Sequence, residues 1–128
     1  MTPKFRAYDG GSLSRMYQPD EVMVGNGDIW IIDEDSVAGD WIVNNDLHLM
    51  QSTGLREKNG KEIFEGDVVK MAKDVYSEPT HYEVVRHYGG AYRLESIQHG
   101  CELWLRHTDC EVVGNVYENQ ELLEEAED

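Results

Sequence analysis

The feature that most constrains this chain is the regular alternation of short apolar runs with turn-forming residues. An extended run at residues 4–8 ends in the Asp-Gly-Gly-Ser sequence of residues 9–12, and residues 25–28 read Gly-Asn-Gly-Asp just before an apolar run at residues 29–32. Glycine and asparagine accept the positive φ values of tight turns, and β-branched and aromatic residues favour strands. The sequence therefore predicts short strands joined by tight turns.

The same alternation continues to residue 117. Gly66 precedes one β-branched run, where a glycine permits a sharp entry, and Gly114 lies inside another, where we expect a bulge or a close contact. Near the end, Asn119 is the expected N-cap of a short helix carrying Leu122 and Leu123. The expected strands cover residues 4–8, 15–17, 29–32, 41–43, 47–50, 68–71, 82–87, 92–95, 101–105 and 111–117.

These elements predict a mainly β fold of the β-rich α+β class. Residues 1–56 are expected to form an N-terminal β region. Residues 57–117 hold about five strands, which have the number and spacing of a small SH3-like β-barrel. Residues 118–128 are expected to form an acidic tail that is helical or frayed.

Acidic side chains outnumber basic ones by 26 to 11, which gives a formal charge of −15. Nucleic-acid affinity depends on lysine and arginine displacing counterions, so this charge opposes binding to DNA, RNA and anionic membranes. The densest basic stretch, residues 56–73, mixes five cations with four carboxylates and does not form a phosphate-binding track. Five acids in residues 121–128 indicate a solubilising end or, alternatively, an interaction tail for a basic partner.

Two further observations indicate a cytoplasmic protein. The first eleven residues lack the apolar core of a signal peptide, and no window is apolar over a membrane-spanning length. Cys101 and Cys110 are too few for a disulfide framework, and we expect both to be free thiols in a reducing cytosol.

His99, Cys101, His107 and Cys110 form the set that most resembles a metal site. Zinc prefers tetrahedral nitrogen and sulfur ligands, and two close pairs are a common way for a short chain to supply them. However, His-x-Cys followed by His-x-x-Cys is not a standard spacing, and Cys101 lies in an apolar run. We expect a small buried cysteine and surface histidines instead, and whether the four meet in space is left open.

No other pattern assigns catalytic chemistry. The carboxylates of Asp33, Glu34 and Asp35, and of Glu65 with Asp67, are expected as chance neighbours with structural or solvated roles. The stretch 28–35 lacks the alternating oxygen ligands of a calcium loop. Ser12, Ser14 and Ser36 lack a nucleophile elbow, and no glycine-rich run leads into Gly-Lys-Ser/Thr. We therefore predict no catalytic, cofactor-binding or metal-binding residues and no enzymatic activity.

Trp30, Trp41 and Trp104 are expected in the core, although an exposed tryptophan would mark a protein-binding hot spot. The polar stretch 53–66 is expected as a connecting loop, with a partner or subunit interface as the functional alternative.

Three segments of the chain are distinctive, and they are residues 4–9 (KFRAYD), residues 49–70 (LMQSTGLREKNGKEIFEGDVVK) and residues 111–123 (EVVGNVYENQELL). In their order and spacing, they resemble the YopX family of small phage and prophage proteins. The chain departs from the family pattern at Tyr8, where the family often has tryptophan, and at Ser52, where it often has an aromatic residue. It also departs at Gln120, where the family often has proline.

The resemblance implies a phage or prophage origin, a bacterial host cell and a β-rich fold, but it supplies no established molecular function. The first hypothesis is a non-enzymatic accessory protein that binds another protein or itself, as a possible homo-oligomer. The alternative is an acidic inhibitor that imitates nucleic-acid charge and blocks a host DNA-binding enzyme. A hydrolase or metalloenzyme comes third.

Overall fold

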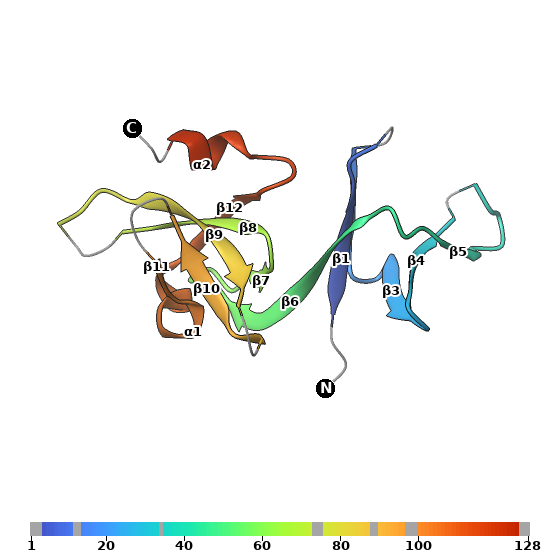
Figure 1. Cartoon of the computed structure of the whole chain (residues 1–128), viewed down its shortest axis with the longest axis horizontal. Coiled ribbons are helices and arrows are strands. Elements are labelled where there is room, and N and C mark those ends of the chain that lie inside the picture. Colours follow the sequence, from blue (N-terminus) through green and yellow to red (C-terminus); the bar gives the residue numbers. More distant parts are fainter. Residues whose placement is uncertain are drawn as a thin grey trace. The chain divides into compact units, whose positions relative to one another are not determined.

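The computed structural model describes residues 4–11, 14–33, 35–72, 76–87, 90–96 and 100–125. Strands dominate these residues and the helices are short, so the predicted mainly β fold is confirmed (Figure 1). The chain divides into two compact units, Met1–Ser52 and Thr53–Asp128. The division falls inside strand β6 (His48–Arg56), which begins in the first unit and ends in the second.

The first unit is built on β1 (Phe5–Asp9). This strand pairs antiparallel with β2 (Arg15–Tyr17) on one side and with the first half of β6 on the other. The strands expected at residues 4–8 and 15–17, on either side of the predicted turn, are confirmed. A buried cluster forms the core of the unit, and its members are Ala7, Tyr17, Val22, Ile31 and Leu47.

A three-stranded antiparallel sheet completes the first unit. It has the order β3 (Val22–Gly25), β4 (Asp28–Ile32), β5 (Trp41–Val43). The β3–β4 hairpin turns through Asn26 and Gly27, whose φ values are 54° and 80°. Two successive residues with positive φ are typical of the type I′ turn, whose twist matches that of the flanking strands. The turn predicted at residues 25–28 is confirmed.

The second unit contains a five-stranded antiparallel sheet of order β11-β10-β9-β8-β12 (Figure 1). The five strands expected between Gly66 and Tyr117 are confirmed, and their closure into an SH3-like barrel stays a prediction. Their bounds are β8 (Asp67–Met71), β9 (Thr80–Arg86), β10 (Tyr92–Glu95), β11 (Gly100–Glu102) and β12 (Glu111–Asn115).

The core of the second unit combines residues from this sheet with Ile63 of β7 (Glu62–Phe64) and Leu103. Alternate residues of β9 supply Tyr82 and Val84 to this core. The stretch 53–66, expected as a connecting loop, instead contributes the end of β6, a turn and all of β7. Ile63 and Phe64 are both buried, so this stretch helps to build the core.

The strand expected over residues 101–105 is interrupted. β11 ends at Glu102, and the chain continues as one turn of helix, α1 (Leu103–Arg106), followed by the 3-10 turn η2 (His107–Asp109). Tertiary contacts explain the difference. Leu103 is fully buried, and the Arg106 guanidinium donates hydrogen bonds to the carbonyl oxygen of Ala72 at 3.1 Å and to Asp109 at 2.9 Å.

A second short helix, α2 (Glu121–Glu125), lies at the expected place. The helix begins at Glu121, two residues after Asn119, and the Asn119 side chain accepts a hydrogen bond from the amide of Asn115 at 3.2 Å. Its role as the N-cap stays a prediction. In the described part of the chain, no helix combines the length and the apolar character needed to cross a bilayer.

Candidate functional site

Three of the four candidate zinc ligands, Cys101, His107 and Cys110, lie in the described residues, and they do not form a metal site there. The Cys110 thiol is buried and lies 3.3 Å from the carbonyl oxygen of Arg106, and Nδ1 of His107 donates to the carbonyl oxygen of Arg56 at 2.7 Å. His99 lies outside the described residues. Across the described ranges, no three histidine, cysteine, aspartate or glutamate side chains are placed to hold an ion.

The environments of the two thiols also oppose nucleophilic chemistry. Burial raises the pKa of Cys110 to about 12, and the neighbouring thiol of Cys101 and the carboxylate of Asp109 act in the same direction. Burial likewise raises the pKa of Cys101. Because the thiolate is the reactive form, both cysteines are held in their inert state at neutral pH.

The carboxylate pairs have local structural roles. Asp67 is fully buried, and its Oδ2 accepts the amide of Phe64 at 2.8 Å. Glu65 pairs with Arg86 at 3.8 Å, so it differs from Asp67 in environment and partner. Asp33 accepts the amide of Asp35 at 3.0 Å, which is a turn contact. Glu34 lies outside the described residues.

The serines that are described also show no catalytic arrangement. The Ser36 hydroxyl donates to Asp40 at 2.9 Å and accepts the amide of Ala38 at 3.3 Å, which is again a turn contact. Ser14 adopts a positive φ of 46° just before β2, and Ser12 is outside the described residues.

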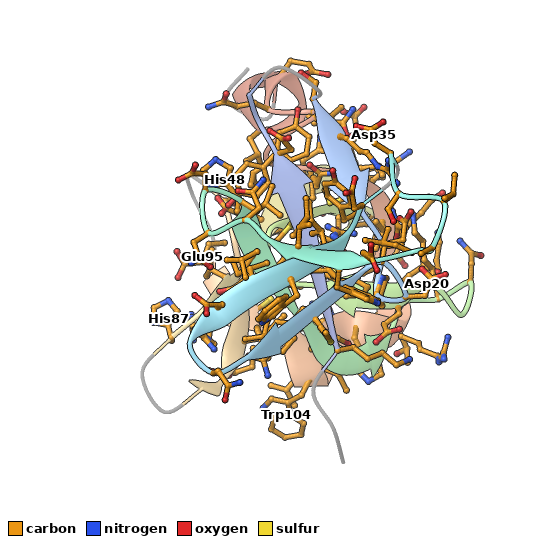
Figure 2. All side chains as sticks on the ribbon, turned by 90° about the vertical axis from the view of Figure 1, so that its right-hand side faces the viewer. Asp20, Asp35, His48, His87, Glu95 and Trp104 are labelled. Carbon is orange, nitrogen blue, oxygen red and sulfur yellow. The ribbon has the colours of Figure 1, made fainter. Side chains whose placement is uncertain are left out.

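The tryptophans depart from the core expectation. Trp104 is 64% exposed, so its expected core position is wrong, and Figure 2 shows its side chain projecting from the ribbon. The single turn of α1 buries the side chain of Leu103 and leaves that of Trp104 exposed to solvent. Trp30 and Trp41 are half-buried and lie on adjacent strands of the first unit.

The sheet β3–β4–β5 has apolar side chains on both of its faces. One face contributes Val22 and Ile31 to the buried cluster. Successive side chains of a strand point to opposite faces, so Met23, Trp30 and Val43 lie on the other face. These three are direct cross-strand partners, because Met23 pairs with Trp30 and Trp30 pairs with Val43. They form a continuous apolar row across the sheet.

This row is accessible. Met23 is 47% exposed and Val43 is 42% exposed. Beside the row, the half-buried pair of Ile32 and Trp41 extends the apolar surface on the same face. We call the surface formed by Met23, Trp30, Ile32, Trp41 and Val43 the outer face of this sheet.

The hairpin holds the Trp30 indole in place. Its Nε1 donates to the carbonyl oxygen of Gly25 at 3.3 Å, so the polar atom of the ring has a partner within the hairpin. The Asn45 carboxamide ties the segment after β5 to the start of β4, because it accepts the amide of Ile29 and donates to Asp28, at 2.8 and 2.9 Å. The outer face is therefore built on a locally fixed scaffold.

The outer face lies in a segment with unusual charge. Residues 16–55 contain eight of the 26 acidic residues and none of the 11 lysines and arginines. Those that the structure describes lie at or beyond the ends of the strands, including the exposed Asp20 and Asp35 that Figure 2 labels. The nearest cation in sequence, Arg15, is engaged by Glu21 at 2.6 Å. The apolar surface is therefore bordered by negative charge.

The sequence contains two signals for this surface that our predictions missed. The short strands β3, β4 and β5 are apolar at consecutive positions, and a small unit can bury only one face of such a sheet. The second signal is the absence of lysine and arginine between Arg15 and Arg56.

A cavity of about 280 Å³ also opens in the first unit. It combines apolar walls with carboxylates, and the latter are partly used by the backbone, since Asp9 accepts the amide of Gly11 at 2.8 Å. The lining residues are Asp9, Tyr17, Ile31, Ile32, Asp33, Asp35, Ile42 and Asn44.

Comparisons with known proteins place the chain among related sequences and structures. A family model described as YopX protein matches residues 4–124. Protein EF1440 from Enterococcus faecalis is 27% identical, with a TM-score of 0.63, and the match covers 96% of this chain and 99% of that one. Protein yopX from Bacillus subtilis is 21% identical, with a TM-score of 0.66, and covers 94% and 97% of the respective chains. A comparison with curated proteins found no match.

Proposed function

The chain belongs to the YopX family, and from this premise we propose that it is a phage or prophage accessory protein that works by binding another protein. Catalysis is not part of this proposal. Its place of action is the cytoplasm of the bacterial host. The family model spans almost the whole chain, from residue 4 to residue 124, so both units take part in the family's common structure.

The observation that carries the proposal is the exposed row of Met23, Trp30 and Val43. Apolar side chains in cross-strand register make a flat surface, and tryptophan and methionine are enriched at the centres of protein interfaces. Because the buried cluster of the unit uses the opposite face, the row is not needed to close the core. A surface of this kind is typical of a docking site.

The non-enzymatic part of the proposal is supported by the state of the ionisable groups. The two thiols are kept protonated by burial, and the pairs of carboxylates are engaged by turn amides or by arginine. An enzyme site needs a group poised to transfer a proton or attack a substrate. In the described ranges, Asp33, Ser36, Asp67, His107 and Cys110 instead have structural partners.

Partner capture with matched variants tests the proposal. The tagged chain is incubated with host lysate, and the bound proteins are compared with those of Met23→Thr/Val43→Thr. The control is Val24→Thr/Ile42→Thr, which alters the same strands at 42% and 44% exposed positions on the opposite face. We expect the control to retain the partner and the row variant to lose it. A strictly monomeric chain that captures nothing would reject protein binding as the function.

The charge of residues 16–55 favours one second candidate, an acidic inhibitor that imitates nucleic acid. In that case carboxylates alone carry the binding, so capture weakens steeply with salt and is insensitive to the apolar row. Deleting residues 121–128 tests the tail contribution separately. Capture that survives both this deletion and high salt would rule out charge mimicry.

A further inference from the structure

We infer that the outer face of the β3–β4–β5 sheet docks a cationic segment of a partner protein, in which apolar side chains are interspersed with lysine or arginine. This inference rests on the proposed function and deepens it, because it names the surface and the chemistry of the partner.

The apolar part of the recognition comes from the cross-strand row. Met23 and Val43 occupy the two edge strands, and Trp30 lies between them on the central strand. An apolar side chain placed over Trp30 would contact all three strands. Since the indole nitrogen already donates to Gly25, covering the ring leaves no indole hydrogen-bond donor without a partner.

The charged part comes from carboxylates around the same surface. Asp28 precedes Trp30 by two residues on β4 and therefore lies on the same face. Asp20 comes just before β3, and Asp46 comes just after β5. Both are exposed. With no lysine or arginine between residues 16 and 55, cations for these carboxylates are best supplied by a partner, and the resulting field attracts cationic segments.

Lysine and arginine also suit the tryptophan surface. Their aliphatic stems can cover apolar area while their charged ends reach carboxylates, and their cations are attracted to indole rings. The apolar row and its acidic border thus favour the same kind of partner.

The same charge argues against two other occupants. A second copy of this chain, bound through the same surface on a two-fold axis, would place one acidic border against another. A nucleic acid would bring phosphates against the carboxylates. The partner segment that fits best is therefore cationic and apolar.

Synthetic peptides provide the test on the intact chain. The probe is a short dye-labelled peptide of leucine and lysine, and fluorescence anisotropy measures its affinity. One control peptide replaces lysine with glutamate, and the other replaces leucine with serine. We expect the leucine–lysine peptide to bind at least about tenfold more tightly than either control, because each control removes one of the two contributions.

Matched variants locate the binding. Met23→Thr/Val43→Thr should weaken the leucine–lysine peptide about tenfold, and Val24→Thr/Ile42→Thr should leave its affinity unchanged. Threonine keeps the strand preference of these positions. Circular dichroism confirms that each variant is folded.

Charge variants provide an independent arm that leaves the apolar row intact. Asp20→Asn/Asp46→Asn should weaken the peptide roughly threefold at low salt. Removal of two exposed carboxylates from the second unit, Glu78→Gln/Glu121→Gln, is the matched control and should have a smaller effect.

Each alternative result overturns the inference in a recognisable way. If the leucine–glutamate peptide binds as tightly as the leucine–lysine peptide, the partner segment is not cationic. If the serine–lysine peptide binds as tightly, and Met23→Thr/Val43→Thr does not weaken the leucine–lysine peptide, the carboxylates alone carry the binding, as in charge mimicry. Equal weakening by Val24→Thr/Ile42→Thr would place the peptide elsewhere. Absence of peptide binding would reject the cationic partner, whereas only failed capture of any protein from host lysate rejects the proposed function.

Discussion

The carboxylate of Glu57 accepts the backbone amide of Val112 at 3.0 Å, across 55 residues of sequence. Its other oxygen accepts the amides of Asn59 and Lys61 at 2.7 and 3.1 Å. One buried side chain therefore shapes the turn between β6 and β7 and joins it to β12. The two ends of this link lie in two of the three segments that resemble the YopX family.

The Glu57→Gln variant should lower the free energy of unfolding by about 1–3 kcal/mol at pH 7, because the NH2 group that replaces one carboxylate oxygen cannot accept a hydrogen bond from a buried backbone amide. Urea denaturation measures the change. Glu111→Gln is the matched control, since it removes a partly exposed carboxylate of β12 that lies 3.8 Å from Lys58. That surface pair should contribute less than about 1 kcal/mol.

The effect of Glu57→Gln should depend on pH in a defined direction. Burial alone would raise the pKa of Glu57, but the amides of Val112, Lys61 and Asn59 outweigh it, so the pKa is lowered from 4.5. A lowered pKa in the folded state stabilises the fold above pH 4.5, and this contribution is lost as the pH falls through the folded value. The free energies of unfolding of the unsubstituted chain and of Glu57→Gln, measured by denaturation at several pH values, should therefore converge as the pH falls. A difference that stays constant from pH 7 to acid would contradict this account.

The side chain of Asn119 lies against the backbone of Gly114, and this close contact leads to a second prediction. A Cβ at position 114 would lie 2.5 Å from Oδ1 of Asn119 and 2.6 Å from its Cγ. Gly114→Ala should therefore destabilise the chain by roughly 1–3 kcal/mol, because the space is already filled. Thermal unfolding of Gly114→Ala, Asn119→Gly and the double variant measures the coupling. Fully additive losses would show that the two positions do not compete for space.

The fold was predictable where local chemistry decides it. Asn26 and Gly27 accept positive φ, so the β3–β4 turn follows from two residues. Gly114 marks the irregular pairing of β8 with β12, where the register shifts between Val112 and Gly114. Both features are encoded within a few residues of where they occur.

The rest depended on contacts between residues distant in sequence. The run that contains Leu103 fits a strand or a helical turn equally well, since short apolar runs have no decisive periodicity. The contact of Arg106 with Ala72, 34 residues away, supports the helical turn. Likewise, the alternation of side chains along β4 does not say which of its two faces meets the core. The exposure of the row of Met23, Trp30 and Val43 therefore could not be predicted from strand propensity.

Glu83 and Glu95 face each other on neighbouring strands. Here we expect a substitution to stabilise the chain, in contrast to the two destabilising substitutions above. Burial and then the charge of Glu95 raise the pKa of Glu83. Glu95 has partners, because His87 lies 2.9 Å from it and Arg93 lies 3.6 Å away, and Figure 2 labels His87 and Glu95. Glu83→Gln should therefore stabilise the chain at pH 7 by a few tenths to about 1 kcal/mol.

The gain from Glu83→Gln should disappear in acid. A raised pKa in the folded state gives stability that is present below 4.5 and is lost as the pH rises through the folded value. The neutral glutamine avoids this loss. Melting temperatures across this pH range measure the difference, with Glu78→Gln as an exposed control. A gain of equal size at all pH values would point to packing rather than charge.

Cys110 provides the last prediction. Burial raises its pKa to about 12, so the folded chain holds almost no thiolate at pH 8. In the Cys101→Ser variant, we expect Cys110 to react with a thiol reagent only when the chain unfolds. Because the unfolded thiol ionises near 9.0, stability should also decline between pH 9.0 and about 12. Rapid labelling of the native variant at pH 8 would mean that this thiol is exposed and reactive, which would reopen the zinc hypothesis for His107 and Cys110.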